Sequence, residues 1–330
     1  MKQFVNAIGI DVSKATLDCH DHVGQHLDQV PNSKQGFKQF LKWARKNNTD
    51  LSQVLICFEH TGIYSLPLAV YLTEQKIIFS MVPGLQIKRS LGIQRGKSDK
   101  ADAKAIARYA YLHRDEVKPY NLPSPKLLDL KAMLSLRQKM VSERAGYISA
   151  KKEIAAIGSI YSNSILAVRS KLIKGLTQQI AEVESQMIKM IQSDQDLKRV
   201  FDLVTSVKGV GLIVGVTIIV YTNCFTAFDD WRKFACYCGI APFPYKSGTS
   251  IRGKDKIHYL ANKRVKTLLS NAASSSIVHN PEMRAYYQRR LQEGKNKFST
   301  QNIIRNKIIS RVFAAVQRGT PYVDTFRFAA

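Results

Sequence analysis

Short apolar runs alternate with amphipathic segments through the first third of the chain. Residues 4–30 alternate and then turn near Gly24, which predicts two or three antiparallel strands. Further strands are expected at 53–58 and 77–82, and helices at 36–46, about 66–75 and about 98–113. Strands first, followed by alternating helices and strands, are typical of an α/β fold with a mixed sheet.

From Pro123 the pattern changes to long, mostly polar helices. Apolar residues recur at a 3-4 spacing from 133 to 157, interrupted only by Glu143, and from 173 to 190 without interruption. This is coiled-coil periodicity. Because the segment 158–164 is turn-like, we expect an antiparallel helical hairpin, which would serve equally well as an oligomerisation arm.

The third segment opens with the apolar stretch VKGVGLIVGVTIIV. Its Gly-x-Gly, formed by Gly209 and Gly211 after Lys208, resembles a helix-hairpin-helix, in which backbone N–H groups at a helix N-terminus bind a phosphate. A plain packing joint between two helices fits the pattern about as well. Two further helices, near 259–279 and 300–317, make this segment mostly helical.

We therefore predict three domains: an α/β domain over 1–122, a coiled-coil hairpin over 123–198, and a basic helical domain over 199–330. A chain of 330 residues exceeds the usual size of one hydrophobic core. The N-terminal residues lead directly into a strand, and no apolar run reaches the roughly 18–20 residues of a membrane span. A cytosolic protein, associated with the nucleoid, is expected.

Charge indicates a polyanionic partner. The chain has 50 Lys and Arg against 25 Asp and Glu, a formal net charge of +25, and residues 199–330 are the most basic part. Such an excess favours binding to a phosphate backbone, whether DNA or RNA. The five cysteines include no CxxC pair and no histidine at zinc spacing, so neither a disulfide framework nor a zinc site is expected.

Four carboxylates are spaced as a metal-dependent nuclease requires. Asp11 and Glu59 end or interrupt β-prone apolar runs, and Asp99 and Asp102 lie three residues apart on an expected helix. Oxygen ligands from three elements suit Mg²⁺. Each residue also has a plain explanation, since Asp11 fits a strand-end turn and acidic residues in a first helical turn favour the helix dipole. The combination is much less expected by chance than any one of them.

A basic loop, YKSGTSIRGKDK, follows in the third segment. Its cations and glycines suit phosphate binding, with the backbone approaching closely at the glycines. The candidate contacts are Lys246, Gly248, Arg252, Lys254 and Lys256.

The segments GIDVSKATLD, FEHTGIY, KSDKADAKAIARY and GIAPFPYKSGTSIRG together resemble the DEDD-type transposases and Piv-type DNA invertases. The resemblance implies an N-terminal domain of ribonuclease-H fold, similar to a RuvC resolvase. It implies that Asp11, Glu59, Asp99 and Asp102 hold Mg²⁺, two ions in number, and that Ser247 is the nucleophile. It also implies a homo-oligomer, dimeric or tetrameric, on DNA sites and, for insertion-sequence members, a structured guide RNA.

A covalent phosphoserine would conserve phosphodiester energy between cutting and rejoining, which a water nucleophile would not. Ser250 and Thr249 are competing nucleophiles, and Arg252 is a candidate for stabilising the oxyanion. Other readings stay open: a purely phosphate-gripping loop, a RuvC-like endonuclease that uses water, and a non-catalytic nucleic-acid-binding scaffold. An actin-like ATPase would need a second Gly-rich phosphate loop, which the sequence lacks.

Overall fold

The computed structural model describes residues 4–92, 99–116, 118–157, 163–247 and 251–324. The side chains of residues 244–247, 251, 252 and 254 lie outside this description. The chain divides into two compact units, Met1–Leu122 and Pro123–Ala330.

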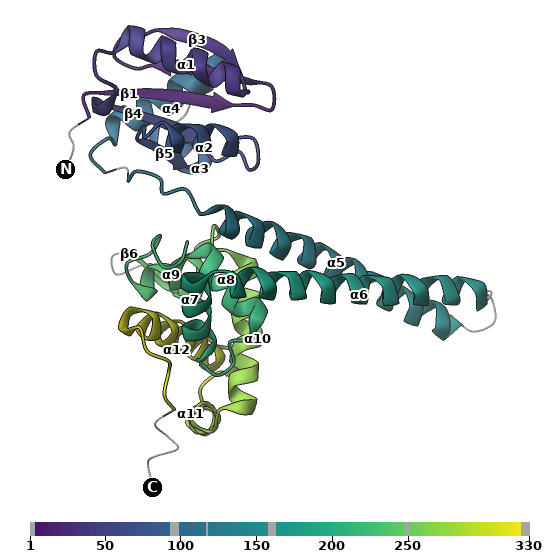
Figure 1. Ribbon diagram of the computed structural model, residues 1–330. Helices are drawn as coiled ribbons and strands as arrows, with labels where there is room; N and C mark the ends of the chain where they lie inside the picture. Colours follow the sequence, from purple (N-terminus) through teal and green to yellow (C-terminus); the bar gives the residue numbers. More distant parts are fainter. Residues whose placement is uncertain (1–3, 93–98, 117, 158–162, 248–250, 325–330) are drawn as a thin grey trace. The chain divides into compact units, whose positions relative to one another are not determined.

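Unit 1 contains a five-stranded mixed sheet in the order β3-β2-β1-β4-β5 (Figure 1). Its strands are β1 (Asn6–Val12), β2 (Thr16–Asp21), β3 (Leu27–Pro31), β4 (Val54–Glu59) and β5 (Phe79–Val82). β1, β2 and β3 pair antiparallel in sequence, whereas β4 pairs parallel with both β1 and β5. The mixed α/β sheet expected from the sequence is confirmed, and it is compatible with a nuclease-like fold.

Helices cover both faces of this sheet. They are α1 (Lys34–Asn47), α2 (Leu66–Glu74), α3 (Gly84–Ser90) and α4 (Asp99–Leu112), with a short 3₁₀ turn at Leu51–Gln53. Strand residues of alternate parity face opposite layers: Ile8 and Ile10 pack with α1 and α2, whereas Ala7 packs with α3 and α4. The sequence did not predict α3, because Ile87 is the only buried side chain of this helix.

Unit 2 begins with two long helices, α5 (Pro125–Ile157) and α6 (Asn163–Gln192), which run side by side (Figure 1). Arg137 Nε donates to Glu184 Oε1 at 2.6 Å, and seven residues later Arg144 Nη1 donates to Thr177 Oγ1 at 3.2 Å. Because the α5 partner advances as the α6 partner recedes, the helices are antiparallel. Most of the expected turn between them lies outside the described residues.

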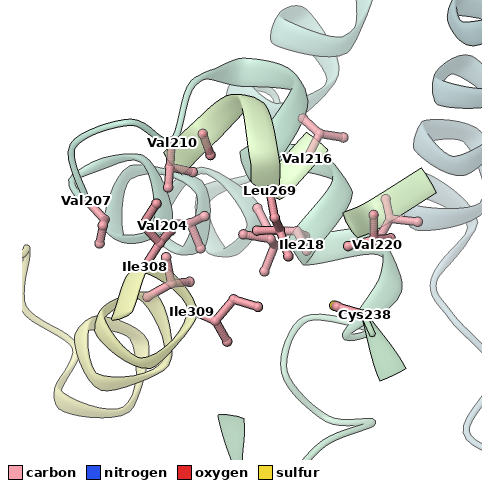
Figure 2. Packing of buried hydrophobic residues seen from close by; sticks show 14 of the residues in the cluster. Val204, Val207, Val210, Val216, Ile218, Val220, Cys238, Leu269, Ile308 and Ile309 are labelled. Atoms are coloured by element: carbon pink, nitrogen blue, oxygen red, sulfur yellow. The ribbon is translucent and has the colours of Figure 1, made fainter. Parts of the chain in front are cut away.

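The remainder of unit 2 is mostly helical. Its elements are α7 (Gln195–Thr205), α8 (Leu212–Tyr221), α9 (Trp231–Tyr237), β6 (Phe243–Ser247), β7 (Ile251–Lys256), α10 (Lys263–His279), α11 (Pro281–Gln292) and α12 (Lys297–Arg318). The helices contribute to one apolar core, in which Ile218 of α8 lies near Leu269 of α10 and Val204 of α7 lies near Ile308 of α12 (Figure 2). Leu130, on the first turns of α5, belongs to the same core.

Two elements of unit 2 were not expected from the sequence. The basic loop contains an antiparallel β-hairpin, β6-β7, whose polar residues and Pro244 conceal the strand pattern. Helix α11 has a single buried residue, Met283, and is set instead by Asn280, whose side chain accepts from the Met283 N–H ahead of Pro281.

All five cysteines are free thiols. None of the helices in the described ranges combines the length and apolar character that a membrane span needs.

Candidate functional site

Two carboxylates of the site lie at the ends of neighbouring parallel strands. Asp11 is the penultimate residue of β1 and Glu59 is the last residue of β4. Ile10 pairs with Phe58, so Asp11 and Glu59 stand at the next level of the ladder, on the same face of the sheet. This face carries α4, because Cys57, two residues before Glu59, packs with Ile106 and Tyr109.

A third carboxylate, Asp18, lies directly opposite Asp11 on β2. Asp18 is 2% exposed, and its Oδ1 accepts from Gln29 Nε2 of β3 at 2.9 Å. Sequence reasoning missed Asp18. The signal was present in DVSKATLD: a tight turn between Val12 and Thr16 would have paired Asp11 with Asp18 across a hairpin.

Gly9 determines how α4 lies on the sheet. A Cβ at position 9 would stand 2.1 Å from Ala107 N and 2.5 Å from Ala103 O, so the helix backbone rests directly on β1. Going two residues along the strand to Asp11 covers about 6.6 Å, which corresponds to about 4.5 residues of helix. Helix α4 runs opposite to β1, because Lys104 acts on His20, beside Gly9, and Arg108 acts on His22, beside Ala7. Counting about 4.5 residues back along α4 from the midpoint of Ala103 and Ala107 therefore reaches a point between Asp99 and Asp102. The close approach at Gly9 therefore brings both carboxylates toward Asp11.

Electrostatics agree with this geometry. Burial, followed by the charges of Asp102, Asp99, Asp18 and Glu59 in that order, raises the pKa of Asp11 from 3.8 to about 6. The charges of four other carboxylates thus act on Asp11.

The donor set fits a hard divalent cation, since carboxylate oxygens are what Mg²⁺, Mn²⁺ and Ca²⁺ prefer. A cation would also relieve the repulsion that raises the pKa of Asp11. Within the described part of the chain, no three acidic, histidine or cysteine side chains are already drawn into a metal-binding group. The carboxylates are gathered on one face but are not closed around a point.

Glu59 has a special neighbour in Gly84, the first residue of α3. A Cβ at position 84 would stand 2.0 Å from Glu59 Oε1. The space that a side chain would occupy is therefore filled by the Glu59 carboxylate, and Gly84 keeps that carboxylate at the edge of the sheet.

Asp11, Asp18, Glu59, Asp99 and Asp102 are called the acidic row below. Positive charge borders this row. Burial, followed by Lys104, lowers the pKa of His20, and burial, followed by Arg108, lowers the pKa of His22. Lys104 and Arg108 are one turn apart on α4 and so share a face. Sequence reasoning did not single out these cations, because their relation to the carboxylates depends on how α4 packs.

The predicted phosphate contacts near the Gly-x-Gly lie between α7 and α8. Gly209 has φ +97°, and a Cβ there would stand 2.6 Å from Ala272 O, so glycine is needed for both conformation and packing. Gly211 is the N-cap of α8 and has open space around it. Lys208 Nζ forms an ion pair with Asp324 at 3.1 Å.

The predicted serine loop is only partly described. Ser247 ends β6 and pairs with Ile251, while Lys246 pairs with Arg252 on β7. Gly248, Thr249 and Ser250 lie outside the described residues. Lys254 also lies on β7, and Lys256, the last residue of that strand, is exposed.

Comparison with known proteins identifies the class. A family model described as a transposase, of the DEDD type, matches residues 8–155, and a second, described as transposase of the IS116/IS110/IS902 family, matches residues 201–288. The first match spans the carboxylates. The second begins before the Gly-x-Gly and includes the β6-β7 hairpin that carries Ser247, called the serine hairpin below. These matches define a DNA transposase or recombinase.

Relatives narrow the class. The chain is 26% identical over 325 residues to the pilin gene-inverting proteins of Moraxella bovis and Moraxella lacunata, which covers 96% of this chain and 97% of theirs. It is 32% identical over 122 residues to an uncharacterized 43.6 kDa protein of insertion element IS110 in Streptomyces coelicolor, covering 36% of this chain and 29% of that one. The chain belongs to the family of IS110 transposases and pilin gene invertases.

Proposed function

We propose that this chain is a site-specific DNA recombinase of an insertion sequence, which cuts and rejoins strands in a magnesium-dependent reaction through a phosphoserine at Ser247. The observation that carries the proposal is the acidic row: Asp11 is surrounded by Asp18, Glu59, Asp99 and Asp102 on the α4 face of a mixed sheet. We assign unit 1 to a ribonuclease-H-like, RuvC-like domain, an assignment that its mixed five-stranded sheet supports.

Asp11, Glu59, Asp99 and Asp102 would hold two Mg²⁺ ions. Bound there, the metal supplies charge neutralisation on the transferring phosphoryl group and favours the serine alkoxide. Ser247 Oγ attacks the phosphorus, a P–Oγ bond forms, the P–O bond to one deoxyribose breaks, and the leaving oxygen takes a proton. Reversal by an incoming deoxyribose hydroxyl rejoins the strands and returns the proton to the serine.

The remaining assignments follow the same proposal. Lys208, Gly209 and Gly211, together with Lys246, Gly248, Arg252, Lys254 and Lys256, contact the nucleic-acid backbone, and Arg252 stabilises the oxyanion. The α5-α6 pair acts as a coiled-coil arm for a homo-oligomer that joins two DNA sites. A structured RNA from the element guides the target choice.

Inversion of a chromosomal segment is the second candidate, because the pilin gene-inverting proteins match nearly the full chain. Substrate arrangement distinguishes the two activities. A plasmid with paired inverted sites reports inversion, and a donor carrying the element ends reports excision and insertion. Excision products would support transposition, and inversion alone would support the invertase.

The mechanism is tested with a suicide DNA substrate that cannot religate. We expect a covalent protein–DNA adduct at residue 247 that requires Mg²⁺ and is absent in Ser247→Ala and in Asp102→Ala, with DNA binding retained in both. Ser250→Ala is the matched control and should form the adduct. Cleavage by Ser247→Ala at the parental rate with unlinked DNA ends would instead assign a water-using endonuclease.

Mixing the two inactive variants adds information about geometry. An adduct recovered from Ser247→Ala and Asp102→Ala together would mean that the serine and the metal ligands come from different subunits. No recovery would favour assembly of the site within one chain.

A further inference from the structure

Unit 2 contains a buried arginine with no acidic partner. Arg305 on α12 is 8% exposed, and within the described ranges its guanidinium donates to two neutral amide oxygens: Nη1 to Asn302 Oδ1 at 3.1 Å and Nη2 to Gln301 Oε1 at 3.2 Å. Its Nε has no hydrogen-bond partner. Among the described residues, no carboxylate forms an ion pair with Arg305, although eight other pairs between Lys or Arg and a carboxylate are formed.

A second cation, Lys266, lies on α10, the helix that packs against α12. Lys266 is half-buried. Burial, followed by the charge of Arg305, lowers the pKa of Lys266, and burial lowers the pKa of Arg305. Two like charges in a partly desolvated place repel each other and lose hydration, so the arrangement is unfavourable unless an anion joins them.

The cluster is connected to the segment that precedes the serine hairpin. Asn302, which accepts from Arg305, and Asn306, one turn further along α12, both donate their Nδ2 to Ile240 O, at 2.7 and 3.0 Å. Ile240 is fully buried, and three residues later the chain enters β6, which ends at Ser247. Asn302 therefore links Arg305 to the segment that leads into the hairpin.

We propose that Arg305 and Lys266 form a binding site for a phosphate group of the DNA backbone, next to the segment that leads into the serine hairpin. The planar guanidinium and the ammonium are the two groups that proteins use for phosphate. The assignment of DNA as the source of the phosphate rests on the proposed recombinase function. The binding of an anion does not rest on that function, because it follows from two cations that have no carboxylate partner among the described residues.

The first test measures thermal unfolding of the full chain in sodium chloride and in sodium phosphate at equal ionic strength. Phosphate should raise the Tm of the parent, because a ligand that binds the folded state stabilises it. In Lys266→Met this rise should be smaller than in the parent, while the Tm in chloride should match or exceed that of the parent, since a half-buried cation has been removed. Lys263→Met, an exposed lysine on the same helix, is the control and should keep the parental phosphate response.

The second test measures affinity for a short DNA duplex against salt, without cleavage. Lys266→Met should lower the slope of log K against log salt by about one unit and the affinity on the order of tenfold at 0.1 M salt, as expected for one lost phosphate contact. Arg305→Met should act in the same direction. Lys266 is only half-buried, so Lys266→Met should still fold. This variant therefore tests the proposed phosphate site even if Arg305→Met does not fold.

The outcomes separate cleanly. A lower Tm of Lys266→Met in chloride, with the phosphate response retained, would make the lysine structural and overturn the proposal. A smaller phosphate response without any change in DNA affinity would mean that the site takes free phosphate and would overturn its assignment to DNA. Failure of the suicide substrate to trap Ser247 would contradict the phosphoserine mechanism and leave both of these measurements intact.

Discussion

Gly84 has no side chain, and the space that a side chain would take there is occupied by the carboxylate of Glu59. The atom that a Cβ would meet is the mobile end of Glu59 and not backbone, so a methyl group would displace the carboxylate and leave the fold intact. Position 84 is thus part of the acidic site even though glycine contributes no ligand.

We expect Gly84→Ala to lower the rate of strand cleavage on the order of 10²-fold, as displacement of a reacting group by about 1 Å can do. Its Tm should stay close to that of the parent. Gly146→Ala is the control, since position 146 lies in helix α5 with open space around it and alanine there should leave cleavage unchanged. Parental cleavage by Gly84→Ala would show that Glu59 is not held by this contact.

Asp11 gives a prediction for stability against pH. Its pKa is raised to about 6 in the folded chain, so above pH 6 the folded state contains a carboxylate whose ionisation is disfavoured, whereas the unfolded chain ionises at its ordinary pKa. The loss of folding stability caused by ionised Asp11 is therefore complete above about pH 6, and it disappears as the pH falls toward 3.8.

In the presence of a chelator, Asp11→Asn should consequently unfold at a higher temperature than the parent at pH 7.5. The difference should shrink between pH 6 and pH 4, as Asp11 becomes protonated in the parent. Glu143→Gln, an exposed carboxylate on α5, is the control and should show no such difference. A Tm gain of Asp11→Asn that is independent of pH would contradict the electrostatic coupling among the carboxylates.

At the scale of elements, the acidic site depends on the contact between β1 and α4. Strand β1 supplies Asp11, helix α4 supplies Asp99 and Asp102, and the backbone contact at Gly9 sets the register between them. Here the obstructing atoms belong to backbone, which cannot yield as a flexible side chain does.

Gly9→Ala should therefore push α4 away from the sheet, with a loss of about 1–3 kcal/mol in the free energy of unfolding, typical of overpacking. Cleavage should fall further than this loss explains, because Asp99 and Asp102 move relative to Asp11. Denaturant unfolding and cleavage rates of the folded fraction measure the two effects. Unchanged stability would mean that α4 does not rest on β1 as described.

At the scale of the whole molecule, positive charge is concentrated late in the chain. Residues 246–311 hold 15 Lys and Arg against 3 Asp and Glu. This excess exceeds what the ion pairs of that segment neutralise, since Glu282 pairs with Arg311, and Glu293 with Arg289 and Arg290.

We expect affinity for duplex DNA to fall by about 10³-fold or more between 50 and 200 mM salt, if about six phosphates are contacted. Electrophoretic or fluorescence titrations over this range would measure it. The isolated segment is not required, because the full chain contains all the cations in question. Affinity that hardly changes over this range would argue against backbone contacts as the main source of binding.

The sequence by itself determined much of this protein. Apolar periodicity is a local property of the chain, so it predicted the strands of unit 1, helices α1, α2 and α4, and the long α5 and α6. It also singled out Asp11 and Glu59, which end or interrupt apolar runs, and Asp99 and Asp102, which lie three residues apart on an expected helix, because both patterns are visible without a fold. The resemblance of four motifs to a transposase family is confirmed by the family matches.

Tertiary structure alone decided the rest. Asp18 joins the acidic row because a hairpin register sets it opposite Asp11, and Gly9 and Gly84 matter because other elements approach them closely. The proposed phosphate site of Arg305 and Lys266 depends on how α10 packs against α12. Helix α11 was missed because Met283 is its one buried side chain, too few for a periodic pattern, and the β6-β7 hairpin was missed because Pro244 and the polar residues of its sequence conceal the strand pattern.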